Sequence, residues 1–449
     1  MTDPQPDPAR GAEVYAADRA HVFHSWSAQK ALKPLAIAGA QGCYVWDYDG
    51  NRYLDFSSQL VNTNIGHQHP KVIAAIAEQA AKLTTIAPQY ANEARGEAAL
   101  RLTDLAPAGF SKVFFTNGGA DANENAIRMA RLHTGRDKVL TFYRSYHGNT
   151  GAAISSTGDP RRWPNEYATG HVHFFGPYLY RSSFWASTPQ EESRRALEHL
   201  EQVIQFEGPA SIAAILIETI VGTAGVLVPP PGYIEGVRAL ADKYGIVWIA
   251  DEVMCGFGRA GSWFAFEQFG ATPDLITFAK GANSGYVPIG GVIISDEIAA
   301  TFDERVFPGG LTYSGHPLAS ASVVATIDAM REEGIVENAE DIGQQIIGPA
   351  LAGIAERHPV VGEVRGLGVF WALDLVSDRA TRAMLAPYGG SSEAMTRLSA
   401  QARSHGLLTF TNFNRLHVVP PCVITAEEAK EGLAILDEAL TVVDGYYQG

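Results

Sequence analysis

The chain has 449 residues, of which 46% are hydrophobic and 18% are charged, and its formal net charge is −15. This length is enough for more than one domain, and the composition is that of a globular protein. Because nucleic acids and anionic membranes attract broad positive surfaces, the negative charge argues against both as partners.

The cysteines and the N-terminus indicate a compartment. Cys43, Cys255 and Cys422 lie far apart, are odd in number and lack the spacing of a metal site. They are expected to be free thiols in a reducing environment. The N-terminus has no basic run leading into an apolar stretch, and no apolar run reaches the ~20 residues that span a membrane. The sequence therefore predicts a cytoplasmic protein without a signal peptide or membrane segment.

The N-terminal part predicts a disordered start, a helix and a hairpin. Residues 1–10 are expected to be disordered, and residues 11–32 are expected to carry a helix. In residues 42–56, apolar and polar residues alternate around Asp49-Gly50. This pattern is typical of a small antiparallel hairpin.

From about residue 70, helical stretches alternate with short apolar runs. Such runs predict a mainly parallel sheet that is covered on both faces. The predicted strands are residues 112–116, 138–143, 213–219, 245–251 and 275–281. A second α/β pattern begins after about residue 330, with strands near 368–375 and 415–419.

Most of the predicted strands end in a polar or charged residue, among them Thr116, Glu218, Asp251 and Lys280. Ligands of open α/β sheets bind at the carboxyl ends of the strands. Pyridoxal phosphate (PLP) needs a lysine and an acid there. Burial lowers the pKa of the lysine so that it can form an imine, and the carboxylate keeps the pyridine nitrogen protonated. Lys280 and Asp251 are the candidates for these two groups.

Three further segments could hold parts of this cofactor. A strand runs into Asn117-Gly118-Gly119 and then into a helix, whose free N–H groups and dipole favour an anion. A plain turn is the commoner meaning of an isolated Gly-Gly pair. Tyr146 could stack on the ring and Thr312 could donate to a phosphate, although core and turn residues look the same in sequence.

Two other motifs predict different sites and are weaker. Residues 256–261 fit G-x-G-x-x-G after a strand, which is the dinucleotide-binding fingerprint. No helix opens directly after them, and the acidic pair Asp251-Glu252 would repel a pyrophosphate, so an NAD dehydrogenase is the weaker alternative. The histidine pairs at 67 and 69 and at 171 and 173 lack a third ligand, so no metal site is predicted.

Together these segments resemble the class III aminotransferases, which are fold-type I PLP enzymes. The resemblance runs over nearly the whole chain through TNGGADA, YHG, the Glu218 segment, DEVMCGFGRAG, TFAKG and LTYSGHPLA, in that order. It implies an α/β fold with a large domain, built on a mostly parallel seven-stranded sheet, and a smaller α/β domain built from both chain ends. The implied division is an N-terminal segment 1–65 that joins the small domain, a PLP-binding domain 66–328 and a C-terminal small domain 329–449.

The resemblance also implies roles for single residues. Lys280 would be the Schiff-base and proton-shuttling lysine, and Asp251 would pair with the pyridine nitrogen. Tyr146 and Val253 would pack on the two faces of the ring. Thr312 would reach the phosphate in the neighbouring subunit, which implies a homodimer or homotetramer with shared active sites. The full set of implied cofactor-binding residues is Lys280, Asp251, Val253, Gly119, Ala120, Tyr146, Glu218 and Thr312.

The substrate residues depend on departures from relatives. In the ornithine and γ-aminobutyrate branches a second Glu follows the Glu218 equivalent by five positions; here Thr223 stands there, so these branches rank low. Arg415 is the candidate for a movable arginine that binds a substrate carboxylate, and a surface ion pair is its alternative role. The predicted walls of the substrate pocket are Trp26, Leu60 and Val61.

These features predict a ping-pong ω-transaminase that moves the amino group of a primary amine or ω-amino acid to a 2-oxo acid, in the first place pyruvate. The run SSQLVNTNIGHQHP resembles branches that act on taurine, so a taurine:2-oxoglutarate aminotransferase is the alternative. A glutamate-semialdehyde aminomutase or a dialkylglycine decarboxylase would share the cofactor residues. A binding or regulatory protein without activity would not need to keep both Lys280 and Asp251.

Overall fold

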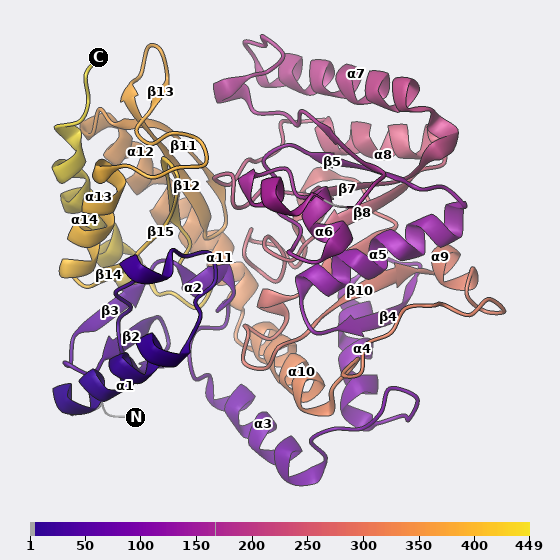
Figure 1. The fold of residues 1–449 in the computed structure, drawn as a ribbon, viewed down its shortest axis with the longest axis horizontal. Helices are drawn as coiled ribbons and strands as arrows, with labels where there is room; N and C mark the ends of the chain where they lie inside the picture. The colour runs from indigo at the N-terminus through magenta and orange to yellow at the C-terminus, as the bar shows by residue number, and fades with distance from the viewer. Residues whose placement is uncertain (1–4, 167) are drawn as a thin grey trace.

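The computed structural model describes residues 5–166 and 168–449, whose strands form three sheets flanked by helices (Figure 1). The strands are β1 (Ile37–Gln41), β2 (Tyr44–Asp47), β3 (Arg52–Asp55), β4 (Phe110–Thr116), β5 (Lys138–Phe142), β6 (His171–Phe174), β7 (Ile212–Glu218), β8 (Val247–Asp251), β9 (Leu275–Phe278), β10 (Gly290–Ser295), β11 (Val361–Leu367), β12 (Phe370–Asp378), β13 (Ala383–Met384), β14 (Leu407–Leu408), β15 (Phe410–Asn412) and β16 (Arg415–Val418). The α-helices are α1 (Pro8–His21), α2 (Ser58–Val61), α3 (Pro70–Lys82), α4 (Glu93–Leu105), α5 (Gly119–Thr134), α6 (Gly151–Ser156), α7 (Pro189–Glu207), α8 (Tyr233–Tyr244), α9 (Asp296–Ala300), α10 (Pro317–Glu332), α11 (Ile335–Ile342), α12 (Gly348–Arg357), α13 (Glu393–Ser404) and α14 (Ala426–Asp444).

The central sheet has seven strands in the order β4-β10-β9-β8-β7-β5-β6. Strand β10 is antiparallel to both of its neighbours, and the other neighbouring pairs are parallel, which confirms the predicted mostly parallel sheet. Alternate side chains of a strand point to opposite faces of the sheet, and on this sheet both faces are buried. On β7, Ala214 and Leu216 pack in the cluster of helix α5, whereas Ile215 and Ile217 pack in the larger cluster behind the sheet.

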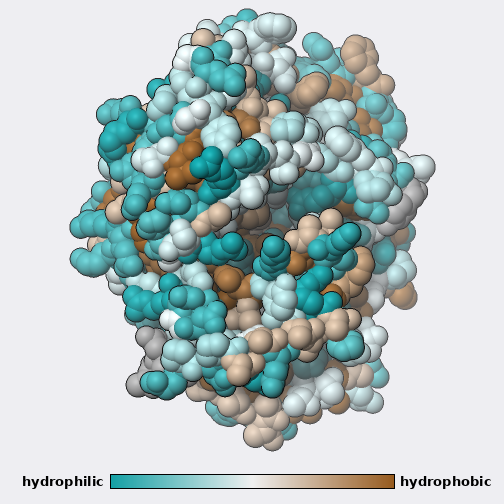
Figure 2. Space-filling view, turned by 60° about the vertical axis from the view of Figure 1, so that its left-hand side comes forward, coloured by the Kyte–Doolittle hydropathy of each residue, from teal (hydrophilic) through white to brown (hydrophobic). Residues whose placement is uncertain are grey.

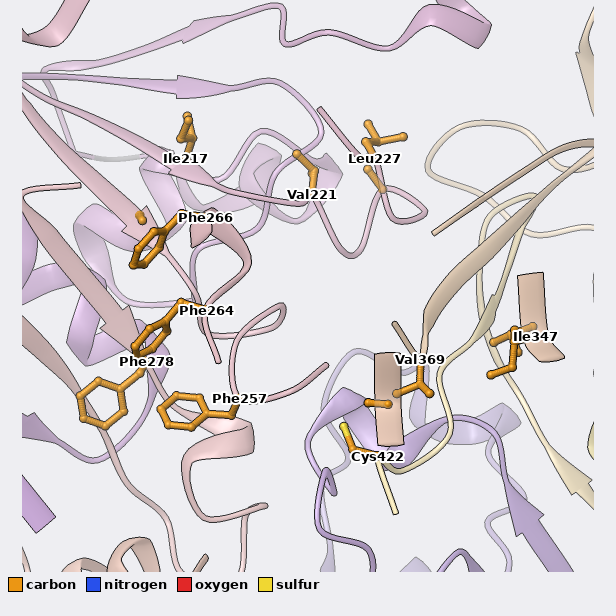
Figure 3. Close-up of a cluster of buried hydrophobic side chains, with 14 of the residues drawn as sticks. Ile217, Val221, Leu227, Phe257, Phe264, Phe266, Phe278, Ile347, Val369 and Cys422 are labelled. Carbon is orange, nitrogen blue, oxygen red and sulfur yellow. The ribbon is translucent and has the colours of Figure 1, made fainter. Parts of the chain in front are cut away.

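The larger cluster is rich in aromatic side chains. Phe257, Phe264 and Phe278 lie together in Figure 3, with ring centroids 5.5 Å apart for Phe257 and Phe264 and 6.1 Å apart for Phe257 and Phe278. Phe264 also stacks on Phe266 at 5.6 Å. Such pairs stabilise the core beyond the apolar area they bury. They hold in place the segment that follows β8, which begins at the carboxyl edge of the sheet.

The central strands appear where the sequence predicted them, with two differences. Strand β9 ends at Phe278, so Lys280 lies after the strand, at the start of a short 3₁₀ turn with a φ of 40°. Strands β6 and β10 were not predicted. The first has only four residues, two of them histidines, and the second begins with two glycines, which rarely mark a strand.

The N-terminal expectations need correction. Helix α1 already begins at Pro8, so the expected disorder of residues 1–10 is wrong for residues 8–10, while residues 1–4 lie outside the described residues. The cause is local: the Asp7 side chain accepts a hydrogen bond from the Arg10 N–H, and Pro8 stands at the first helical position. The helix ends at His21, well short of residue 32.

Both chain ends contribute to one further sheet. The predicted hairpin is present as antiparallel β2 and β3, and β14 from the C-terminal part adds to β3 in parallel, with Leu407 opposite Leu54. The indigo N-terminal elements accordingly lie beside the yellow C-terminal ones in Figure 1. A third sheet contains β11, β12, β16 and β15 in this order, with β13 paired to β12. The division at residues 65 and 328 stays a prediction, and helix α10 runs through the second boundary.

The G-x-G-x-x-G segment forms a turn and not the start of a helix. Gly258 and Gly261 have φ values of 83° and 86°. Between them, the fully buried Arg259 donates from Nη2 to Ser58 Oγ at 3.0 Å and to Asn64 Oδ1 at 2.8 Å. Arg259 also donates to the backbone oxygen of Pro420. The segment therefore ties the N-terminal and C-terminal parts of the chain together.

Candidate active site

Asp251 and Lys280 line the same pocket at the carboxyl edge of the central sheet. Asp251 ends β8 and is paired with Thr277 of the adjacent β9, and Lys280 follows three residues after Thr277. Burial lowers the pKa of Lys280 from that of an ordinary lysine, although the negative charges of Asp251 and Glu218 partly oppose this shift. A lysine of lowered pKa presents a neutral amine, which is the form that attacks a carbonyl group.

A network of buried donors fixes the Asp251 carboxylate. Its Oδ2 lies 2.7 Å from His147 Nδ1 and accepts from Asn123 Nδ2 at 2.8 Å. Its Oδ1 accepts from the Val253 N–H at 3.1 Å. Thr277 in turn holds Asn123 by a 2.8 Å hydrogen bond. The sequence analysis missed Asn123. The signal that could have identified it is its place in the first turns of the helix that follows the glycine pair, on the side that faces the sheet.

The N-terminus of helix α5 forms one wall of this pocket, here called the inner pocket, through Gly118, Gly119 and Ala120. No side chain caps the helix, so its first N–H groups and its dipole are available to an anion. A Cβ on Gly118 would point into open space, whereas a Cβ on Gly119 would lie 2.8 Å from Val253 Cγ1. Gly119 is therefore required for close packing against Val253.

Tyr146 and Val253 both line the inner pocket. The Glu218 side chain does not line it. The Oε1 atom of Glu218 accepts from the Tyr146 N–H at 2.9 Å, and its Oε2 accepts from the Gly222 N–H at 2.8 Å. Burial raises the pKa of Glu218 to about 7. Glu218 thus positions the Tyr146 backbone and contacts the pocket only through it.

A second pocket, here called the outer pocket, adjoins the inner one and shares Leu60, Tyr146 and Lys280 with it. Its lining residues are Trp26, Leu60, Tyr146, Asp159, Pro160, Arg161, Thr223, Met254, Lys280, Gly389, Phe410, Thr411, Asn412 and Phe413. The molecular surface is also visibly hollowed near the middle of the face in Figure 2, where apolar side chains lie among polar ones. Because Lys280 lines both pockets, a substrate bound there can extend into the outer pocket.

Of the three residues predicted to line the substrate pocket, two lie in its wall and one does not. Trp26 and Leu60 line the outer pocket, and these residues are 63% and 52% exposed. Val61 instead is buried in a hydrophobic cluster with Ile220 and Val226 and lines neither pocket. The reason is the strained backbone of this segment, in which Val61 has a φ of 56°.

Two other predicted residues lie outside the lining of these pockets. Arg415 is buried behind Phe413, with its guanidinium carbon 5.3 Å from the centre of the Phe413 ring. Burial lowers the pKa of Arg415, and its Nε has no hydrogen-bond partner among the described residues. Thr312 is exposed in the segment between α9 and α10. The arginine that does line the outer pocket, beside Lys280, is Arg161, which the sequence analysis did not single out.

The residues present fit PLP. The inner pocket combines a lysine of lowered pKa, a carboxylate held by three donors and an uncapped helix N-terminus. These groups match the aldehyde, the ring nitrogen and the phosphate of this cofactor. Within residues 5–166 and 168–449, no group of three or more His, Cys, Asp or Glu side chains is placed to hold a metal ion, and no helix is long and apolar enough to cross a membrane.

Comparisons with known proteins agree with this chemistry. The chain is 31% identical over 455 residues to the taurine–pyruvate aminotransferase of Bilophila wadsworthia, covering 96% of this chain and 98% of that protein. It is 34% identical to the putrescine–pyruvate aminotransferase of Pseudomonas aeruginosa, with 96% of each chain covered. The crystal structure of taurine:2-oxoglutarate aminotransferase from Bifidobacterium kashiwanohense, in complex with PLP and glutamate, matches with a TM-score of 0.95 and 43% identity over 100% of both chains. The family profile for class-III aminotransferases matches residues 26–440, and the chain therefore belongs to this family of PLP-dependent enzymes.

Proposed function

We propose that the protein is an ω-transaminase that takes the amino group of a primary amine or ω-amino acid and delivers it to a 2-oxo acid, in the first place pyruvate, by a ping-pong mechanism. The observation that carries the proposal is the continuity of the two pockets. Lys280 and Tyr146 line both, so that the reactive amine faces the cofactor site on one side and an open substrate site on the other.

The protein would position the cofactor and the substrate and transfer the proton between them. Bound PLP acts as the electron sink and carries the amino group between the two half-reactions. Asp251 holds the proton on the ring nitrogen, and His147 and Asn123 keep the Asp251 carboxylate in place. The neutral Nζ of Lys280 would take a proton from the substrate carbon that bears the nitrogen and pass it on within the same half-reaction, and the second half-reaction would run this transfer in reverse.

A specific observation favours a second candidate, transfer from taurine or a similar ω-amino acid to 2-oxoglutarate. The taurine:2-oxoglutarate aminotransferase structure is similar over the full length at 43% identity. Thr223 lines the outer pocket where some branches of the family would place a second glutamate. The buried Arg415, whose Nε lacks a protein partner, remains the candidate for an arginine that swings toward a substrate carboxylate.

We also infer a homodimer or homotetramer with shared active sites, in which Thr312 reaches the phosphate of the neighbouring subunit. Its exposure on the single chain supports this assignment. A cytoplasmic location is supported by the three cysteines, which are all buried and unpaired.

The test is the absorbance of the purified enzyme with bound PLP, first with an amine donor alone and then with an acceptor. We expect the visible band of the bound cofactor to vanish with 3-aminopropanoate, taurine or a simple primary amine. Pyruvate should restore it, and restoration by 2-oxoglutarate alone would select the second candidate. Lys280→Ala should show neither change. A band that no amine alters, an amine conversion that needs no added oxo acid, or release of carbon dioxide would overturn the proposal.

A further inference from the structure

A third pocket, here called the sheet pocket, lies outside the active site on the sheet that both chain ends build. Its apolar wall includes Leu35, Ile37, Val45, Leu407 and Leu408, and its volume is about 520 Å³. It shares no lining residue with the inner or the outer pocket. Pockets of about 300–1,000 Å³ that combine an apolar wall with a few polar groups are typical of small-molecule sites.

The charged side chains of the sheet pocket are basic. Lys33 comes from the N-terminal segment and Arg403 from helix α13, and none of the described residues that line the pocket is acidic. The whole chain has 49 Asp and Glu residues against 34 Lys and Arg residues, so this lining departs from its composition. Both cations are exposed, and neither forms an ion pair or a side-chain hydrogen bond within residues 5–166 and 168–449. Their charges are therefore available to an anion.

A buried hydrogen-bond network forms another part of the wall. Gln59 and His67 both line the pocket, and both bind the carboxylate of Asp55, which is 0% exposed. Gln59 donates from Nε2 to Asp55 Oδ2 at 2.8 Å, and His67 Nε2 lies 2.9 Å from the same oxygen. Because Asp55 holds both side chains, they form a preorganised polar wall beside the two cations.

Gln59 also connects the sheet pocket to the active site. Its φ of 60° and ψ of −100° favour glycine, and the neighbouring Ser58 and Val61 have φ values of 44° and 56°. A strained backbone of this kind persists only where its surroundings hold it, and the bond from Gln59 to Asp55 supplies this hold. Leu60, the next residue, lines both the inner and the outer pocket. One strained turn therefore presents adjacent residues to the sheet pocket and to the substrate site.

We propose that the sheet pocket is a second ligand site, which binds a small monoanion with an apolar body and changes the KM for the amine donor through the turn at Gln59. The acid group of the ligand accepts charge-assisted hydrogen bonds from Lys33 and Arg403. Its hydrocarbon packs on the apolar wall beside Leu407 and Leu408. The inference goes beyond the proposed transaminase function, since the pocket does not include Lys280.

The first test measures the binding of hexanoate to the PLP-loaded enzyme by isothermal titration calorimetry. Hexan-1-ol, which lacks the charge, and acetate, which lacks most of the hydrocarbon, should each bind at least about 10-fold more weakly than hexanoate. Arg403→Gln and Lys33→Gln should each raise the Kd for hexanoate by about 10-fold, and Arg403→Lys should recover part of the loss. Equal Kd values in the wild type and these variants would overturn the proposal.

Arg397→Gln is the matched control. Arg397 lies on the same helix as Arg403, but it donates to the Tyr446 hydroxyl and does not line the pocket. Its replacement should leave the Kd for hexanoate unchanged. A rise in Kd as large as that in Arg403→Gln would show that hexanoate responds to the general charge of α13 and would overturn the site.

The second test measures KM and kcat for propan-1-amine, with pyruvate as acceptor, with and without saturating hexanoate. In the wild type, hexanoate should change the KM for the amine by about 5-fold or more. Gln59→Gly, which removes the bond to Asp55, should still bind hexanoate but lose this effect. Binding without a change in KM would refute the coupling, and an undiminished effect in Arg403→Gln would place hexanoate in the substrate site. A wild type that does not convert any amine would overturn the proposed function, while the calorimetry would still decide on the sheet pocket.

Discussion

The carboxylate of Glu218 holds the backbone of Tyr146, whose N–H donates to Glu218 Oε1 at 2.9 Å. Glu218 ends β7, and Tyr146 lies in the loop after the neighbouring strand β5. The bond joins two adjacent strand ends and sets the position of a ring that lines the inner pocket and lies against the Arg161 guanidinium. Because Glu218 is only 4% exposed, its protonation state affects both the stability of the fold and the geometry of the site.

Stability should fall as the pH rises from about 4.5 to about 7, because burial raises the pKa of Glu218 from 4.5 to about 7. In this window the folded protein keeps a proton that the unfolded chain has released, so raising the pH favours unfolding. The loss at pH 8 should be on the order of 3 kcal/mol. When Tm is measured between pH 5 and 8, it should therefore fall less with rising pH in Glu218→Gln than in the wild type.

Glu252 provides a matched control for this experiment. Its pKa is also raised to about 7 by burial, but its carboxylate accepts hydrogen bonds from Thr219 and from the N–H groups of Ala265 and Phe266. Glu252→Gln should flatten the pH dependence of stability as well, and only Glu218→Gln should also change kcat. Equal pH dependence in the wild type and both variants would contradict this explanation.

Lys280 should destabilise the cofactor-free protein at neutral pH. Burial lowers its pKa in the folded state, so between this lowered pKa and 10.5 the unfolded chain binds more protons than the folded protein, and stability rises with pH in that window. Lys280→Met, which removes the buried amine, should raise the Tm of the cofactor-free protein at pH 7 while it abolishes transamination. Lys243→Met, which removes an exposed lysine paired with Glu201, should give no gain in Tm. A lower Tm for Lys280→Met would refute the expected cost of burial.

Asp251→Asn should reduce kcat by about 100-fold or more while PLP still binds, because a neutral amide cannot hold the proton on the ring nitrogen. Steady-state kinetics and the absorbance of bound cofactor measure the two effects separately. Asp274→Asn is a suitable comparison, since Asp274 lies just before β9 at the opposite edge of the sheet, where it pairs with Arg238 and lines neither pocket. A kcat within a few-fold of the wild type would remove Asp251 from the proposed role.

Thr312→Ala tests the shared active site. If Thr312 reaches the phosphate of the neighbouring subunit, its loss should raise the Kd for PLP by about 10-fold. Mixed dimers of the Thr312→Ala chain and the Lys280→Ala chain should then contain one intact site, with Lys280 from the first chain and Thr312 from the second. Their activity at limiting PLP should exceed that of either variant alone. No gain on mixing would place Thr312 in the site of its own chain, or outside any site.

The sequence predicted the structure best at buried strands, because burial requires a continuous run of apolar residues. The strands ending at Glu218 and Asp251 are uninterrupted apolar runs with a polar last residue, and the strand ending at Thr116 has such a run in its second half. Each appears within two residues of its predicted bounds. The pairing of Asp251 and Lys280 at one sheet edge follows from the same pattern. Strand β10 escaped because its opening glycines resemble a turn.

Side-chain direction limited the prediction of the substrate site. Val61 holds a position that the family resemblance assigns to the pocket wall, but its φ of 56° turns the side chain into the core. Arg161 stands in a short 3₁₀ helix rich in proline and arginine, where no periodicity marks one arginine as different from the next. Only the stacking on Tyr146, which joins segments from two loops, distinguishes it.

The pairing of β3 with β14 has a consequence for the nascent chain. Leu54 finds its partner Leu407 only after most of the protein has been translated. At about 5–20 residues per second, the edge of β3 waits on the order of tens of seconds for that partner. During synthesis this edge presents unpaired backbone groups beside the apolar ring of Phe56, which in the finished protein packs against Gly432 of helix α14. The N-terminal hairpin is therefore a part of the nascent chain that gains from protection by a chaperone at the ribosome.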